Sequence, residues 1–237
     1  WEQREEARVM IRPGISRRSP HAFERTVPEI LTLSSLPLFP LQTVLFPGGL
    51  LPLRVFEVRY LDMVRRCQSA DAPFGVVALK RGSEVRQAGA PPEAFHTIGT
   101  LATIQSLDAS QSGRLMVECR GEQRFEVIRT EMLKNGLWMS DVRRLDDDLA
   151  VPVPPDLTFV GQALARVLES LQARQGYGTP APVSEPMRLD DCGWLANRWC
   201  ELLPIPLELK QRLMQLDNPL VRLELVGDIL HRTGIAG

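Results

Sequence analysis

The sequence lacks most of the residues and motifs that mark an enzyme or a metalloprotein. It has only four cysteines and three histidines in 237 residues, and none follows the spacing of a zinc site. It contains no G-x-x-x-x-G-K-[ST] phosphate loop, no H-E-x-x-H motif and no G-x-S-x-G motif. We therefore expect no metal, no cofactor and no catalytic residue, and we predict that the protein is not an enzyme. A small-molecule enzyme whose site is assembled from distant segments stays open as an alternative.

An excess of basic residues is also absent. The 28 Lys and Arg residues are balanced by 29 Asp and Glu residues, so binding to nucleic acid would need a local basic patch. Arginines and glutamates alternate in the middle of the chain, at Arg114, Glu118, Arg120, Glu122, Arg124, Glu126 and Arg129. This alternation favours cross-strand ion pairs on a solvent-facing surface. Nucleic acid is therefore not an expected partner.

Signals for a membrane or for secretion are missing too. The uncharged stretch 30–53 is long enough to span a bilayer, but its four prolines would break a helix repeatedly. We find no signal-peptide pattern at the beginning of the sequence. We expect no membrane association, and we predict four buried, reduced cysteines in a cytoplasmic protein.

The composition divides the chain into three parts. Residues 1–33 are predicted to form an N-terminal arm, residues 34–148 a β domain, and residues 149–237 a helical subdomain. The acidic Asp146–Asp148 and the proline-rich Val151–Pro155 are typical of a solvated linker between the last two parts.

The β domain is expected to contain about seven short strands and one helix. The strands are predicted at residues 36–41, 50–56, 74–79, 97–107, 115–119, 124–131 and 137–145. The helix is predicted at 57–68, where apolar residues recur on one face, and Gly121 is expected to interrupt the sheet. This pattern indicates a compact, barrel-like sheet.

The helical subdomain is expected from a change of period. Apolar residues repeat every three or four positions in four segments, at residues 157–171, 194–202, 207–216 and 220–231. Asp190 and Asp191 favour a helix N-terminus, and Pro219 suits the first turn of the last helix. The fold class is therefore α+β, with a C-terminal helical bundle.

The most informative feature is an apolar loop between proline-broken segments. Val44, Leu45 and Phe46 are followed by Pro47-Gly48-Gly49, which turns the chain sharply. Loops run over surfaces, so these side chains could form an exposed patch that grips other chains; alternatively, they fold back onto the barrel. Together with Leu50 and Leu51, they are our candidate polypeptide-binding residues.

The same region resembles the N-terminal, substrate-binding domain of Lon proteases. The motifs that carry the resemblance are Leu36-Pro-Leu-Phe-Pro-Leu41, Leu45-Phe-Pro-Gly-Gly49, Leu51-Pro-Leu-Arg-Val-Phe-Glu57, Arg59-Tyr60, Pro73-Phe-Gly-Val-Val77, Ile98-Gly-Thr100 and Gly121-Glu-Gln-Arg-Phe-Glu-Val127. Lys210-Gln-Arg-Leu-Met214 extends it more loosely into the helices. The resemblance implies a PUA-like pseudo-barrel followed by helices.

The resemblance also implies a function. Lon proteases carry ATPase and peptidase domains after this region, and 237 residues leave no room for either, so a stand-alone binding module is expected. Its expected partners are polypeptides, either unfolded chains or specific clients. Because relatives of the PUA-like barrel include RNA binders, an RNA-binding module is the alternative function.

Overall fold

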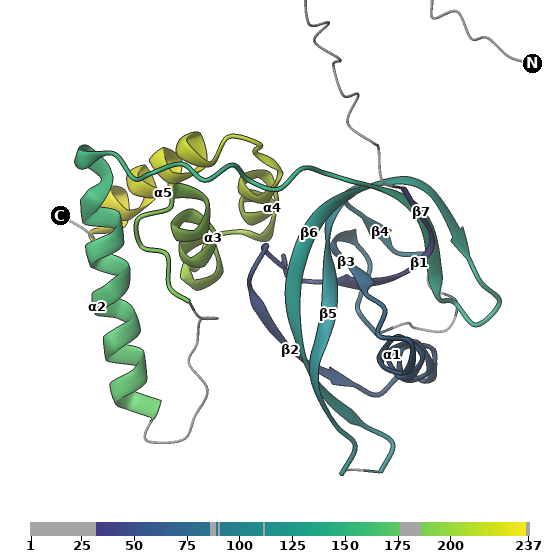
Figure 1. Cartoon of the computed structure of the whole chain (residues 1–237). Helices are drawn as coiled ribbons and strands as arrows, with labels where there is room; N and C mark the ends of the chain where they lie inside the picture. The colour runs from purple at the N-terminus through teal and green to yellow at the C-terminus, as the bar shows by residue number, and fades with distance from the viewer. Residues whose placement is uncertain (1–31, 86–88, 90, 111, 176–185, 236–237) are drawn as a thin grey trace, which may run out of the picture.

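The structure is a computed structural model that describes residues 32–85, 89, 91–110, 112–175 and 186–235. A β pseudo-barrel and a helical bundle lie side by side, and an extended linker joins them (Figure 1). The predicted α+β class, with a pseudo-barrel followed by helices, is confirmed. The predicted arm lies almost wholly outside the described residues, and strand β1 begins at Thr32, inside its predicted range.

The sheet contains seven strands and closes on itself. The strands are β1 (Thr32–Leu41), β2 (Leu50–Val55), β3 (Phe74–Arg81), β4 (Ala94–Phe95), β5 (Ile98–Asp108), β6 (Leu115–Met132) and β7 (Trp138–Arg144). They are hydrogen-bonded in the order β1-β7-β6-β5-β3-β4. Strand β1 also pairs in parallel with β3, whereas the other pairings are antiparallel. This parallel pairing closes the pseudo-barrel.

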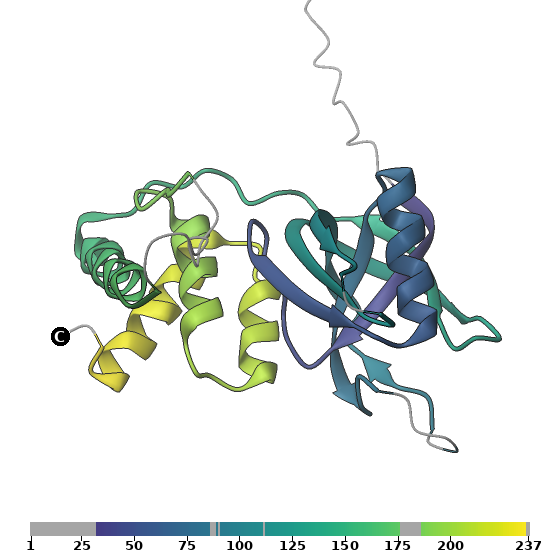
Figure 2. The same cartoon turned by 90° about the horizontal axis from the view of Figure 1, so that it is seen from below.

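A tight interior requires glycine where the strands curve. A Cβ atom at Gly75 would lie 2.6 Å from Leu38 Cδ2 and 2.7 Å from Phe125 Cζ. Glycine therefore lets β3 approach the side chains of two other strands. Helix α1 (Val58–Ala70) covers the pseudo-barrel on the side away from the bundle (Figure 2), and its Tyr60 ring stacks on Phe39 at 4.0 Å between centroids.

One sequence-based boundary in the sheet is wrong. Gly121 was expected to interrupt the strands, but β6 runs unbroken from Leu115 to Met132. The first half of β6 pairs with β2, and the second half pairs with β7. Strand β6 therefore changes its pairing partner near Gly121 and does not break there.

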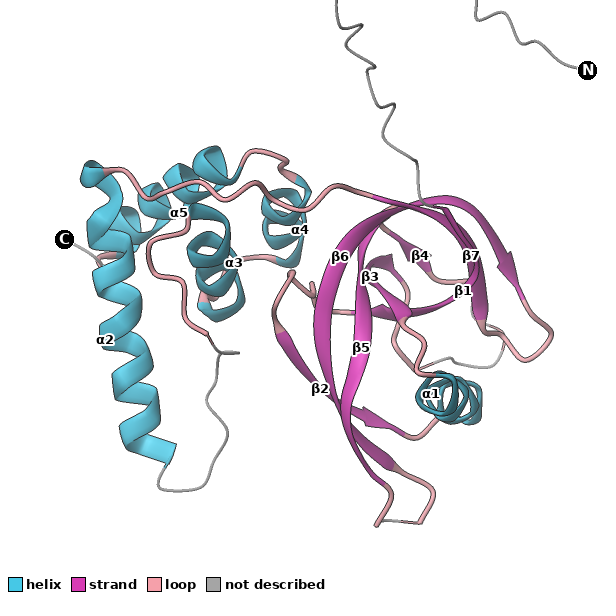
Figure 3. Cartoon of the chain, in the orientation of Figure 1, coloured by secondary structure: helices cyan, strands magenta, loops and turns pink. Residues whose placement is uncertain are grey.

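The bundle consists of a 3-10 turn and four α-helices (Figure 3). These elements are η1 (Pro155–Leu157), α2 (Thr158–Gln175), α3 (Cys192–Leu202), α4 (Leu207–Gln215) and α5 (Pro219–Thr233). Helix α3 is buried from Cys192 to Cys200, and its Trp199 donates a hydrogen bond from Nε1 to Val160 O at 3.0 Å. Among the described residues, no helix is both long and apolar enough to cross a bilayer.

Candidate functional site

The apolar loop lies between the two halves of the molecule. Val44 and Phe46 are buried in the core cluster of the helical bundle, whereas Leu45 is buried in the core of the pseudo-barrel. Alternate residues therefore face opposite sides. The expectation of an exposed patch at these three positions is wrong, because all three side chains are buried. The alternative, that they fold back onto the barrel, holds for Leu45, whereas Val44 and Phe46 pack in the bundle.

Backbone and arginine contacts fix the loop in this position. Gly48 N donates to Gly121 O at 2.7 Å, and Gly121 N donates to Gly49 O at 2.8 Å. A Cβ atom at Gly121 would lie 2.3 Å from Phe46 O, so only glycine permits this approach. On the other side, the buried Arg198 of α3 donates to Pro47 O at 3.0 Å.

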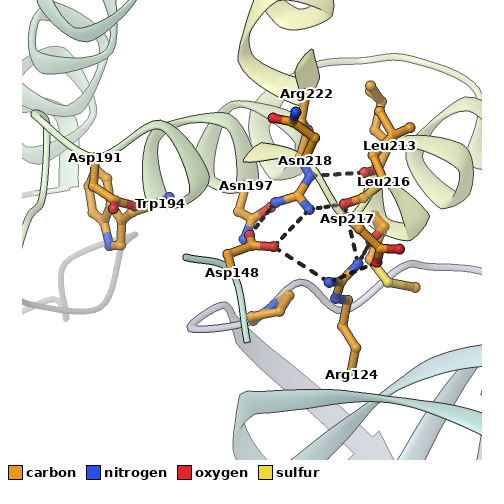
Figure 4. Close-up of polar contacts among 12 residues, drawn as sticks. Arg124, Asp148, Asp191, Trp194, Asn197, Leu213, Leu216, Asp217, Asn218 and Arg222 are labelled. Atoms are coloured by element: carbon orange, nitrogen blue, oxygen red, sulfur yellow. Dashed lines mark hydrogen bonds and ion pairs between the residues drawn. The ribbon is translucent and has the colours of Figure 1, made fainter. Parts of the chain in front are cut away.

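A second set of contacts joins the linker to both halves (Figure 4). The Asp148 carboxylate accepts hydrogen bonds from Arg222 of α5 at 2.5 and 3.1 Å. It also forms an ion pair with Arg124 of β6 at 3.5 Å. Asn197 Oδ1 accepts a further hydrogen bond from Arg222 at 3.0 Å. Asp148 is therefore part of a polar network rather than of a solvated linker, which corrects that prediction.

Arg124 extends this network to the loop before α5. Its side chain is 4% exposed and donates to Met214 O at 3.0 Å and Leu216 O at 3.3 Å. Asp217 lies 3.3 Å from the same guanidinium. The expectation that Arg124 forms an ion pair on a solvent-facing surface is therefore wrong. A cross-strand pair does form nearby, between Glu126 and Arg143.

A polar cleft opens beside this network. Its volume is about 480 Å³, and it lies between the middle of β6, the linker and the start of α3. Its charged lining includes Arg120, Arg144, Arg188 and Asp147, together with the network residues Arg124 and Asp148. Asp191 caps α3 at the edge of the cleft by accepting from Trp194 N at 2.7 Å, as its position in the sequence predicted.

An apolar groove of about 290 Å³ lies beside β2. Strand β2 pairs with β6 on one side, and among the described residues it has no strand partner on the other. The groove is lined by Leu51, Pro52 and Phe56, and by Phe39 of β1 and Val85 of the β3–β4 loop. Pro52 is compatible with an edge strand because proline has no N–H and donates no hydrogen bond to a neighbouring strand.

Two apolar residues of the groove lining are themselves exposed. Phe56 is 48% exposed and Val85 is 44% exposed. Leu51, one of the sequence candidates, is half-buried in the groove wall. Leu50 is half-buried too. Phe56 is the last residue of the strand predicted at 50–56, whereas the sequence alone placed the exposed patch earlier, in the loop at 44–46.

All four cysteines are buried and free, and their burial was predicted from the sequence. Burial raises the pKa of Cys119 and of Cys200 to about 12, so neither is a thiolate near neutral pH. No group of three or more metal-ligating side chains occurs in the part of the chain that the structure describes.

His96 contacts the bundle and should make stability depend on pH. Its Nε2 lies 3.3 Å from Glu208 of α4, and burial lowers its pKa below 6.5, with Glu208 opposing and Lys80 reinforcing that shift. The unfolded chain therefore binds a proton first, and stability falls as pH decreases through about 6.5. In urea titrations at neutral and acidic pH, His96→Gln should reduce this loss and Glu208→Gln should increase it. An unchanged pH dependence in both variants would contradict the assignment.

Comparison with known proteins first identifies the class of fold. A crystal structure titled Lon N-terminal domain protein from Xanthomonas campestris matches with a TM-score of 0.63 and 33% identity, covering 82% of this chain and 97% of that one. The N-terminal domain of Mycobacterium avium complex Lon protease shares the fold, with a TM-score of 0.52 and 17% identity.

The family follows from the sequence itself. The model of the ATP-dependent protease La (LON) substrate-binding domain matches residues 35–232, so the chain belongs to this family. The Lon protease of Anaeromyxobacter dehalogenans is 27% identical over 203 residues, which is 83% of this chain and 23% of that protein. Protein cereblon of Xenopus tropicalis is 26% identical over 72% of this chain and 35% of its own length. The chain therefore spans a minor part of these two proteins.

Proposed function

We propose that this chain is a non-catalytic polypeptide-binding module that holds an extended, apolar segment in the groove beside β2. The observation that carries the proposal is the free edge of β2, bordered by Leu51 and Phe56 in an apolar groove. A free edge offers backbone hydrogen bonds to any sequence, and side-chain pockets beside it select apolar residues. The family description, a substrate-binding domain, supports the same function.

The groove fits an extended chain better than the other candidate partners. A volume of about 290 Å³ is at the lower limit of small-molecule pockets and accommodates a few side chains. Its charged lining residues carry both signs, Arg54 against Glu57 and Glu84, and Glu57 is already paired with Arg59 at 3.2 Å. RNA binding requires a basic groove with stacking aromatics, so we propose polypeptide rather than RNA as the partner.

Replacing Phe56 and Val85, two exposed residues of the groove lining, with serine should weaken binding and leave the fold intact. Both side chains are exposed, so stability should change little, whereas truncating an anchor at an interface typically costs about 2 kcal/mol, or roughly thirtyfold in affinity. Fluorescence anisotropy with a labelled peptide that alternates leucine and serine measures this loss.

The matched control is Ile128→Ser, which removes a side chain that is 60% exposed on β6 and does not line the groove. Its affinity should equal that of the unaltered protein. Equal losses in the control and the double variant, or no binding by the folded protein, would contradict the proposal.

A further inference from the structure

Three arginines in the polar cleft have no acceptor among the described residues. Arg120, Arg144 and Arg188 all line the cleft, and Arg120 and Arg144 are half-buried. The Nε atom of Arg144 is buried and has no hydrogen-bond partner in that part of the chain. Buried polar atoms are normally hydrogen-bonded, so Arg144 Nε keeps a donor that a bound acceptor can use.

The acidic side chains of the cleft are largely engaged elsewhere. Asp148 binds Arg124 and Arg222, and Asp191 caps α3. Glu122 accepts from Thr103 Oγ1 at 2.9 Å. Asp147 is the one acidic lining residue without a contact among the described residues. The cleft therefore presents more free donors than free acceptors.

We infer that this cleft is a second binding site and that it accepts a carboxylate of a polypeptide, either an acidic side chain or a chain terminus. Guanidinium groups match carboxylates in planar, two-point hydrogen bonds. Four acidic side chains also line the cleft, at Glu122, Asp147, Asp148 and Asp191, so a singly charged carboxylate is favoured over a doubly charged phosphate. The inference uses the proposed function only in taking a polypeptide as the source of the carboxylate.

The cleft is separate from the apolar groove. The two share no lining residue, because the cleft lies against β6 and α3 whereas the groove lies between β2 and the end of β1. Binding at one can therefore be removed without altering the other. A polypeptide that used both would combine an extended apolar segment with acidic residues.

Anisotropy titrations with labelled hexaglutamate test the inference on the whole chain. Arg120→Gln/Arg144→Gln should weaken hexaglutamate binding about tenfold or more, as removal of charge-assisted hydrogen bonds predicts. The matched control is Arg129→Gln, which removes an exposed arginine from β6, the strand that also carries Arg120. If the double variant fails to fold, Arg188→Gln, at an exposed position, should still weaken binding severalfold.

The inference would be overturned by an equal loss of affinity in the Arg129→Gln control, or by no hexaglutamate binding at all. It would also be overturned if inorganic phosphate or free glutamate bound more tightly than hexaglutamate. The same holds if an oligouridylate bound more tightly than hexaglutamate at the same arginines. Binding of the apolar peptide should be unchanged in the arginine variants. Phe56→Ser/Val85→Ser should lose binding of the apolar peptide and keep binding of hexaglutamate, so failure of one site can be told from failure of the other.

Discussion

Replacing Phe46 with serine is expected to destabilise the protein by about 3–5 kcal/mol, the usual cost of removing a large aromatic side chain from a core. Phe46 is 0% exposed and belongs to the core cluster of the bundle, although it precedes β2 in the chain. For a chain of this length, the melting temperature should fall by roughly 10 °C. The serine hydroxyl would also lie in an apolar site, which adds to the loss.

The control for this prediction lies in the same loop. Gln42 is exposed, so Gln42→Ser should leave the melting temperature nearly unchanged. Thermal melts and urea titrations of both variants give the comparison. If Phe46→Ser melted like the unaltered protein, the loop would not be packed against the bundle.

Local patterns predicted most of the elements. Helix α1 was expected at 57–68 and occupies Val58–Ala70, and α5 begins at Pro219 with Asn218 as its cap, accepting from Leu220 N at 3.0 Å. Such signals lie within a few residues of one another in the sequence. The two-residue strand β4 was missed, because so short a segment carries no detectable period.

The position of the apolar loop depends on distant residues. The segment Val44-Leu45-Phe46 has the same local apolar pattern whether its side chains face water or another part of the protein. Val44 and Phe46 are buried in the core of the bundle and Leu45 in that of the pseudo-barrel, and Arg198 of α3 contacts the next residue, Pro47, across 151 positions of sequence. Gly121 was misinterpreted for the same reason, since it serves the close approach of Phe46 O rather than a break in the strand.

The apolar groove was predicted only in part. Leu51 was a sequence candidate and lines the groove, but Phe39 and Val85, from other segments, complete it. Whether β2 is an edge strand depends on the pairing order of the whole sheet. Neither property follows from one sequence without long-range contacts, so binding by Leu50 and Leu51 stays a prediction.

Replacing Asp148 with asparagine is expected to destabilise the protein by about 3 kcal/mol. Its carboxylate lies between Arg124 and Arg222, whose side chains are 4% and 1% exposed. Removing one partner of a buried ion pair leaves the other charges uncompensated. We expect the lower end of the usual range because Asp148 is 16% exposed and both arginines keep other hydrogen bonds.

The adjacent Asp147 provides the matched control, because it is exposed and its side chain forms no hydrogen bond or ion pair with another described residue. Asp147→Asn should unfold at nearly the same urea concentration as the unaltered protein. The double variant Asp148→Asn/Arg222→Gln should lose less stability than the sum of the single variants, since both remove the same interaction. Additive losses would show that the two residues act independently. The linker would then not be held to the bundle through this pair, and the orientation of the two halves would depend mainly on the packing of Val44 and Phe46 against the helices.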